Sequence, residues 1–323
     1  MGSYLHSIEY YLPENTLDND KLSQEFPEWE AEKILEKVGI RNRHIVSKNE
    51  TALDMAYQAA EKLLKNFDRE LVDFVLVCTQ SPDYYLPTGA CILQDMLKLR
   101  KDIGAFDYNL GCSGYIYGLA LAKSLINSQV ASTVLLIMAE TYSKHIHPSD
   151  KSNRSIFGDA ATATLILSSA KENIHEFELG TDGKGKDNLI VKRWGMRNHE
   201  FNNQDRIEDY LYMNGPEIFN FTLDVVPELV EKVLLKNNES LDSIDFCIFH
   251  QANKFILEYL RKKLKVDPAK FYINMLETGN TVSATIPIAL KECIQTGLVK
   301  SGNKVLLVGF GVGYSWGATI VTI

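Results

Sequence analysis

Three residues have side chains and neighbours that fit one reaction: Cys112, His250 and Asn280. A cysteine can accept an acyl group from a thioester and hold it as a covalent intermediate. A neutral histidine and an asparagine amide can both donate hydrogen bonds to an oxygen on which negative charge develops, each typically worth about 3 kcal/mol. If a malonyl thioester lost carbon dioxide beside them, its enolate would be stabilised without a strong base. The set therefore suggests condensation of two thioesters.

Cys112 lies in a glycine-containing turn, between Gly111 and the pair Ser113-Gly114, just before an expected helix over residues 113–128. A sharp turn from a strand into a helix exposes the side chain at its centre. The N-terminus of the helix is expected to favour the thiolate through its dipole and free N–H groups. On this turn alone a buried structural thiol is an equal alternative, because the segment is not specific.

His250 and Asn280 each have a structural interpretation when considered alone, and a catalytic role is indicated only when they are considered together. His250 follows the apolar segment 245–249, and α/β proteins place functional side chains at the carboxyl ends of strands. A hydrogen-bonded structural histidine fits that position equally well. Asn280 follows Gly279, where a turn residue or a helix cap is the first interpretation. Only together with Cys112 do the two residues indicate a catalytic site.

An acyl group held on Cys112 would also need hydrogen-bond donors for its carbonyl oxygen. Backbone N–H groups often serve this purpose in oxyanion holes. The candidates are the N–H of Cys112 itself and those of the glycine-rich segment 309–313, which contains Phe310, Gly311 and Val312.

The elements that position these residues are short apolar segments alternating with amphipathic ones. Runs of Val, Ile and Leu that are polar only at their ends indicate strands buried on both faces. Their alternation with helices predicts an α/β architecture, in which helices cover a mostly parallel sheet. The acidic stretch 25–39 is expected to form a solvated amphipathic helix. The expected strands are 73–79, 133–139, 160–167, 245–249, 304–309 and 317–322.

A faint internal repeat divides the chain into two related halves, with about 170 residues between paired segments. The pairs are 73–82 with 245–254 and 133–141 with 304–312. Asn280 stands in the second half roughly where Cys112 stands in the first. Two copies of one βαβ-rich unit, related by a pseudo-twofold axis, would bring these turns together. We therefore predict two units: residues 1–170 with the cysteine, and residues 171–323 with the histidine and asparagine.

The composition is that of a globular chain expected in the cytoplasm. It has 323 residues, 45% of them apolar, and a formal net charge of −8, which argues against non-specific binding to nucleic acid. The N-terminus lacks the pattern of a secretion signal, and no apolar run is long enough to span a bilayer. Five cysteines without a CxxC spacing fit neither a disulfide framework nor a zinc site, and His145 and His147 have no third ligand in sight. No metal or other cofactor is expected.

Four segments carry a family resemblance: GCSGYIYGLALA, FHQANKFI, TGNTVSATIPIAL and GFGVGYSWGA. They resemble the signature segments of β-ketoacyl-acyl-carrier-protein synthase III, the FabH type of condensing enzyme in the thiolase superfamily. The resemblance implies a five-layered αβαβα thiolase fold, a homodimer and a ping-pong reaction on thioester substrates. An acyl-CoA primer would load Cys112. Malonyl-acyl carrier protein would then decarboxylate beside His250 and Asn280, giving a β-ketoacyl product.

The resemblance also implies which residues contact the substrates. In acetyl-using members a Phe before a proline caps the acyl pocket across the dimer interface; Leu86 stands there in this chain, which implies a longer or branched primer. Trp29 is a shifted match to a Trp that stacks on CoA, and Val312 replaces a usual glycine. The residues that would line the site or contact CoA and the carrier protein are Phe310, Gly311, Val312, Lys37, Lys151, Arg154 and Asn253.

Two other functions stay open at this point. An acyltransferase would load Cys112 but pass the acyl group to an alcohol or amine. A non-catalytic partner subunit of a larger synthase would usually have lost the nucleophile, which this chain retains. The sequence names neither the primer nor the pathway, and both bulk fatty acid synthesis and a dedicated surface-sugar or secondary-metabolite pathway fit it.

Overall fold

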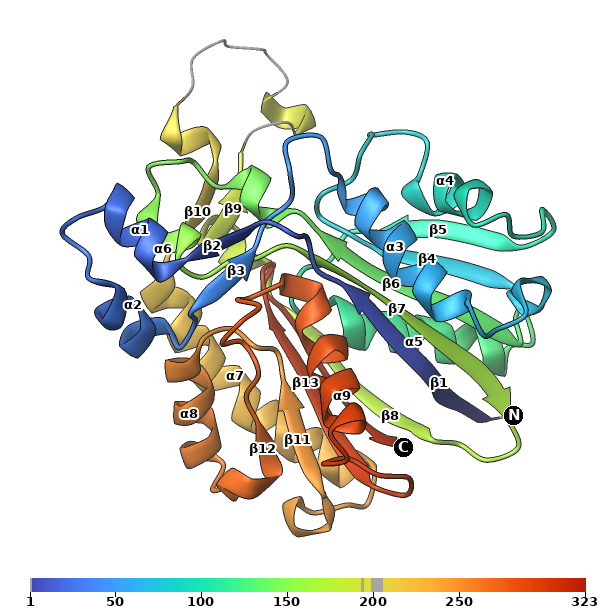
Figure 1. The fold of residues 1–323 in the computed structure, drawn as a ribbon. Coiled ribbons are helices and arrows are strands. Elements are labelled where there is room, and N and C mark those ends of the chain that lie inside the picture. Colours follow the sequence, from blue (N-terminus) through green and yellow to red (C-terminus); the bar gives the residue numbers. More distant parts are fainter. Residues whose placement is uncertain (1, 193–194, 199–205) are drawn as a thin grey trace.

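The structure is a computed structural model that describes residues 2–192, 195–198 and 206–323. Its backbone forms two five-stranded sheets, with helices between and outside them (Figure 1). The first sheet consists of β5 (Gly104–Tyr108), β4 (Phe74–Cys78), β6 (Thr133–Glu140), β7 (Ala160–Ser169) and β1 (Gly2–Tyr11), in that order. The second consists of β12 (Phe271–Tyr272), β11 (Phe246–Phe249), β13 (Lys304–Gly311), β14 (Ser315–Thr322) and β8 (Ile174–Thr181).

The two sheets are built alike. From its β5 or β12 edge, each sheet has two parallel pairings followed by two antiparallel pairings. The strands equated by the sequence repeat, β4 with β11 and β6 with β13, hold equivalent places, which confirms the repeat. The expectation of mostly parallel sheets holds for strand direction, because only β7 and β14 run against the other strands of their sheets, but half of the pairings are antiparallel. β13 returns directly as β14, and a connection that short can join only antiparallel strands.

Six helices form three layers around these sheets. α5 and α9 lie between the sheets and share one apolar core with strands of both. α3 and α4 cover the outer face of the first sheet, and α7 and α8 cover that of the second. The alternating layers confirm the five-layered α/β fold (Figure 1). The bounds are α3 (Ala52–Leu64), α4 (Gly89–Met96), α5 (Gly114–Asn127), α7 (Gly215–Lys236), α8 (Lys254–Lys263) and α9 (Thr285–Gln295).

The central strands have the sequence that this layering requires. All eight residues of β6 are buried, because helices cover both faces of its sheet. Side chains alternate along a strand, so successive residues enter different cores. Val134, Leu136 and Met138 join the core that contains α5, whereas Leu135, Ile137 and Ala139 join the core that contains α3. A strand that is buried on both faces therefore has a continuous apolar sequence.

The N-terminal excursion differs from the expected single helix over 25–39. Two helices, α1 (Asn19–Glu25) and α2 (Ala31–Val38), are separated by a turn at Phe26–Glu30. Pro27 explains the break, since a proline disfavours the helical conformation of the residue before it. The other short elements are β2 (Thr16–Asp18), β3 (Asn42–His44), α6 (Lys151–Arg154), β9 (Leu189–Val191) and β10 (Leu211–Met213).

The chain passes from the first sheet to the second between Ser169 and Ile174. The division into units 1–170 and 171–323 stays a prediction, since α5 and α9 join the two sheets in one core. Among the residues that the structure describes, no helix is both long enough and apolar enough to cross a membrane.

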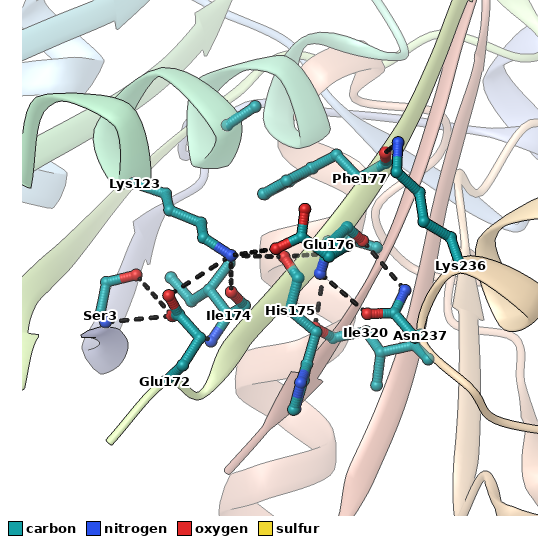
Figure 2. Close-up of polar contacts among 12 residues, drawn as sticks. Ser3, Lys123, Glu172, Ile174, His175, Glu176, Phe177, Lys236, Asn237 and Ile320 are labelled. Atoms are coloured by element: carbon teal, nitrogen blue, oxygen red, sulfur yellow. Dashed lines mark hydrogen bonds and ion pairs between the residues drawn. The ribbon is translucent and has the colours of Figure 1, made fainter. Parts of the chain in front are cut away.

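A buried lysine ties the halves together away from the cysteine turn (Figure 2). Lys123 of α5 donates to the backbone oxygens of Ile174 at 2.7 Å and His175 at 3.0 Å. Its ammonium also pairs with Glu172 at 3.4 Å and Glu176 at 3.3 Å. Glu172 in turn accepts from the N–H and the hydroxyl of Ser3 in β1, each at 3.0 Å. We call Ser3, Lys123, Glu172 and Glu176 the Lys123 cluster.

Candidate active site

The cysteine turn lies where the two halves meet. Cys112 stands between β5 and α5, and the end of β13 packs directly against it. A Cβ atom placed on Gly311 would lie 2.8 Å from the Cβ and 2.9 Å from the sulfur of Cys112. Any side chain there would displace the nucleophile, so this position requires glycine. Gly309 is equally tight, because its Cβ would lie 3.0 Å from the backbone oxygen of Cys112.

The environment of the sulfur raises its pKa. Burial, followed by the nearby Glu140 carboxyl, raises the pKa of Cys112 to about 12. The backbone N–H groups of Val312 and Cys112 hydrogen-bond to the sulfur and act in the opposite direction. The N–H groups thus favour the thiolate, as expected, but removal of the sulfur from water outweighs them and the net pKa is raised. The N–H groups of Cys112 and Val312 are two of the candidates for an oxyanion hole, and that role stays a prediction.

Glu140 is a buried carboxyl that sequence reasoning missed. It ends β6, accepts hydrogen bonds from the N–H of Gln80 and the hydroxyl of Ser81 in the first half, and accepts from the Ser283 hydroxyl in the second. Burial raises the pKa of Glu140 to about 8, although these donors oppose the shift. At neutral pH the carboxyl is therefore mostly uncharged and does not strongly repel a thiolate.

His250 follows β11, and its ring is held on two sides. Its Nδ1 lies 2.8 Å from the Thr285 hydroxyl, which in turn lies 3.0 Å from the backbone oxygen of Val282. The edge of the ring meets Phe310, with centroids 5.7 Å apart. Burial lowers the pKa of His250 to about 3, so the imidazole is neutral under physiological conditions.

Asn280 is fixed through both its backbone and its side chain. Its backbone N–H donates to Ile156, and its backbone oxygen accepts from Gly158 at 3.0 Å. The side-chain amide donates to the backbone oxygen of Ala252 at 3.2 Å, and Oδ1 accepts from the N–H of Val282 at 2.9 Å. The segment around Phe157 thus serves as a backbone support for Asn280.

Val282 connects the three candidate residues. Its N–H orients Asn280, its carbonyl oxygen accepts from the Thr285 hydroxyl beside His250, and its side chain joins the apolar cluster that includes Cys112. Its φ of +56° is unusual for a β-branched residue, so the surrounding contacts must hold this backbone in place. Nothing in the sequence marks Val282 for this role, since β-branched residues normally avoid that conformation.

A cavity of about 930 Å³ opens beside the cysteine. Tyr142, Leu189 and Leu211 line it and share an apolar cluster with Cys112, which is itself 6% exposed. Leu86 also lines the cavity and is 82% exposed in the single chain. Its wall includes His145 as well.

Of the four residues expected to contact CoA or the carrier protein, three lie near the turn between α1 and α2, and Asn253 lies apart from them. Lys37 and Lys151 each lie 5.7 Å from the ring centroid of Trp29, and Lys151 also pairs with Glu28 at 2.6 Å; contact of these residues with CoA stays a prediction. Arg154 is nearby but is paired with Glu25. Asn253 lies elsewhere, at the start of α8, where its side chain caps the helix by accepting from the N–H of Ile256 at 2.9 Å. Its contact with CoA or a carrier stays a prediction.

Within the described residues, no group of three or more His, Cys, Asp or Glu side chains could hold a metal ion. Cys112, His250 and Asn280 are 6%, 2% and 4% exposed, so the site is a buried set of neutral side chains. Such an arrangement suits a covalent thioester and hydrogen-bonded oxyanions.

Comparison with known proteins decides the family. The family described as 3-oxoacyl-[acyl-carrier-protein] synthase III matches residues 106–183, and its C-terminal part matches residues 234–323. The β-ketoacyl-[acyl-carrier-protein] synthase III of Clostridium perfringens (strain ATCC 13124) is 38% identical over 316 residues, 97% of each chain. The chain belongs to the β-ketoacyl-acyl-carrier-protein synthase III family.

Solved structures of this family agree with the fold. A 3-oxoacyl-(acyl-carrier-protein) synthase III crystal structure is 45% identical, with a TM-score of 0.98 and complete coverage of both chains. The synthase III of Pseudomonas aeruginosa PAO1 is 30% identical, with a TM-score of 0.91 over 100% of this chain and 98% of that chain. The fold is thus the thiolase fold of this synthase family, and the protein is an acyl-transferring condensing enzyme. Transfer to an alcohol or amine is not favoured.

Proposed function

We propose that Cys112 carries the acyl group of this synthase and that His250 and Asn280 stabilise the enolate that attacks it. The observation that carries the proposal is the role of Val282, whose backbone holds Asn280 and the Thr285–His250 pair while its side chain packs with Cys112. One residue in a left-handed conformation thereby supports both donors and belongs to the same apolar cluster as the nucleophile, which favours this proposal.

The loading step exchanges one thioester for another. The Cys112 sulfur attacks the acyl carbonyl, CoA leaves, and the thiol proton goes to the departing CoA sulfur. The N–H groups of Cys112 and Val312 already bond to the sulfur region, and they suit the oxyanion of the tetrahedral intermediate. Because burial raises the pKa of the thiol, loading needs deprotonation as the acyl-CoA arrives rather than a resident thiolate.

The condensing step depends on which nitrogen of His250 carries the proton. The Thr285 hydroxyl has one proton to donate, either to Nδ1 of His250 or to Val282 O. When it donates to Nδ1, the ring proton stays on Nε2, and Nε2–H can join the Asn280 amide at the enolate oxygen. Malonyl decarboxylation then gives carbon dioxide and an enolate. The enolate carbon attacks acyl-Cys112, and the sulfur leaves as the product β-ketoacyl thioester forms.

The substrates and partners follow from features outside this pocket. Trp29 between Lys37 and Lys151 suits the adenine and phosphates of an acyl-CoA. Malonyl-acyl carrier protein would supply the second thioester, and no cofactor is needed because decarboxylation itself creates the carbanion.

β5 is an edge strand with half-buried residues, and exposed Leu86 flanks the cavity, which suits pairing with a second copy. A homodimer in the cytoplasm is therefore proposed.

Mass spectrometry after incubation with a panel of acyl-CoA thioesters tests the proposal. We expect one acyl group per chain, on the peptide that contains Cys112, and none on Cys112→Ala. Cys91→Ala is the matched control, because Cys91 is the exposed cysteine among the five and should compete first for non-specific acylation. An unmodified Cys112 across the panel, or acylation that moves to Cys91, would contradict the proposal.

A further inference from the structure

Three polar side chains that hydrogen-bond to one another lie in the wall of the cavity beside Cys112, which also contains Ser81, Asp83 and His145. The Tyr142 hydroxyl donates to Gln80 Oε1 at 2.6 Å, and Gln80 Nε2 donates to Asn109 Oδ1 at 3.0 Å. All three residues line the cavity. We call Gln80, Asn109 and Tyr142 the polar trio. Their surroundings are largely apolar, with Leu86, Leu189, Ile190, Val191, Leu211 and Val312 in the same wall.

The polar trio adjoins the nucleophile. Gln80 Oε1 lies 2.6 Å from where a Cβ atom on Gly111 would stand, so the carboxamide rests against the residue that precedes Cys112. Tyr142 belongs to the same apolar cluster as Cys112. An acyl group on the sulfur would therefore meet these side chains within its first few carbons, rather than at a distant end of the cavity.

The trio retains hydrogen-bonding capacity beyond its internal bonds. A glutamine amide has two N–H groups and an asparagine amide has two more, but the trio uses only one of these four internally. Within the described part of the chain, neither the Asn109 amide nitrogen nor the second Gln80 N–H makes a hydrogen bond to another protein group. The Tyr142 oxygen also keeps its lone pairs, so the wall offers both donors and acceptors.

An unsubstituted alkyl group is a poor match for such a wall. It would remove water from the partly buried Gln80 amide, and from the exposed Asn109 amide where it covers that group, without replacing the lost hydrogen bonds; donors left unpaired in this way weaken binding. A site built to bond a polar substituent typically rejects the analogue that lacks it far more strongly than an apolar site rejects an extra hydroxyl. A carboxylate substituent fits poorly too: no Lys or Arg lines the described cavity, whereas Asp83 does.

We propose that the polar trio is a subsite for an uncharged oxygen on a short acyl group, so that the preferred primer is a hydroxyacyl thioester. This inference rests on the proposed function, because it assumes that Cys112 carries the acyl group. A hydroxyl close to the thioester can accept from an amide N–H of Gln80 or Asn109 and donate to the Tyr142 oxygen. The apolar remainder of the wall would contact the carbon chain.

Initial rates of Cys112 acylation with 3-hydroxybutyryl-CoA (each stereoisomer), butyryl-CoA and glutaryl-CoA test the inference. The hydroxybutyryl and glutaryl groups each differ from butyryl by one added substituent, a hydroxyl or a carboxylate. The ratios of their rates to the butyryl rate therefore report recognition of that substituent. We expect one hydroxybutyryl isomer to load at least about tenfold faster than butyryl, with glutaryl the slowest. In Gln80→Leu and Tyr142→Phe that preference should fall to within about threefold. Gln58→Leu, the same exchange on an exposed position of α3, should retain it.

The outcomes are separable. Faster loading of butyryl by the unmodified protein, or a hydroxyacyl preference that survives in both trio variants, overturns the inference while leaving the proposed function standing. Loading of none of the thioesters overturns the proposed function and the inference with it. If Gln80→Leu does not fold, as judged by its thermal unfolding curve, the Tyr142→Phe ratio alone decides, because that change removes only a hydroxyl.

Discussion

Two polar regions connect the halves of this synthase. In one, a buried charge is paired within the chain; in the other, the buried groups are neutral. In the Lys123 cluster, the ammonium meets two backbone oxygens and two carboxylates, so its charge is compensated within the chain (Figure 2). Around Cys112 the groups are neutral: burial raises the pKa of the thiol and lowers that of His250. The His250 ring is held by the Thr285 hydroxyl at Nδ1 and by a hydrogen bond with the Val282 backbone.

The difference separates a structural cluster from a catalytic one. Buried charges must be paired to be tolerated, and once paired they have little left to offer a substrate. A buried neutral donor that is held by neighbouring groups, as His250 is by Thr285 and the Val282 backbone, can direct one ring nitrogen toward an oxyanion. Changes in the two regions should therefore affect different quantities: turnover for the Cys112 region and the free energy of unfolding for the Lys123 cluster.

Removing a donor from the Cys112 region should have the largest effect. Asn280→Ala should lower the rate of carbon dioxide release from malonyl-acyl carrier protein by about 10²- to 10³-fold, since one oxyanion donor is lost. Acylation of Cys112, measured separately by mass spectrometry, should stay within a few-fold of the unmodified protein. Equal losses in both half-reactions would mean that Asn280 is needed for the shape of the site rather than for the enolate.

Changing the support of His250 should have a smaller effect. Thr285→Val keeps the volume but leaves nothing to donate to Nδ1, so the Nε2–H tautomer loses its stabilising bond. We expect condensation to slow by about tenfold. Thr285→Ser is the matched control, because it restores the hydroxyl and should recover most of the rate. A serine variant as slow as the valine variant would assign the loss to packing.

Glu140→Gln should alter the pH dependence of loading. Below pH 8 the rate should rise with pH, because the Cys112 pKa of about 12 lies above the range and the thiolate fraction grows. As pH passes the Glu140 pKa of about 8, its new negative charge disfavours the thiolate, so the rise should flatten. In Glu140→Gln the rise should continue unbroken. Glu172→Gln, in the Lys123 cluster, should leave the original profile; the same unbroken rise there would contradict this assignment.

Lys123→Met should have the smallest effect on turnover. It leaves two backbone oxygens and two partly exposed carboxylates without their cation, which should lower the free energy of unfolding by about 1–3 kcal/mol. Denaturant titration measures the loss, while condensation should stay within about twofold. Lys232→Met, which breaks an exposed pair with Glu228 on α7, should change neither. A large loss of turnover without a loss of stability in Lys123→Met would remove the distinction between the regions.

The elements that local patterns encode could be predicted from the sequence. Apolar runs marked β6 and β13 because both faces of those strands are covered, and the repeat placed Asn280 opposite Cys112. Pro27 also indicates the break between α1 and α2, whereas the acidic amphipathic pattern over 25–39 favours a single helix. The antiparallel halves of the sheets depend on strand connections that apolar patterning alone does not reveal.

The supports of the site could not be predicted, because they are contacts between distant segments. Glu140 meets Ser283 across the two halves, and Gln80 meets Asn109 and Tyr142 only after the sheets have assembled. The pKa of Cys112 likewise depends on burial, which the adjoining helix start does not reveal. Catalytic residue types therefore stood out in the sequence, whereas the groups that orient and tune them required the fold.

A single-turnover experiment tests the central claim most directly. Acyl-enzyme is prepared with an isotopically labelled acyl group, freed of CoA, and mixed with malonyl-acyl carrier protein. The Cys112 peptide, the carrier product and carbon dioxide are then followed together. We predict that each acyl group lost from Cys112 appears in one β-ketoacyl thioester, with release of one carbon dioxide. An acyl group that stays on Cys112, or that leaves it without carbon dioxide release, would contradict the account.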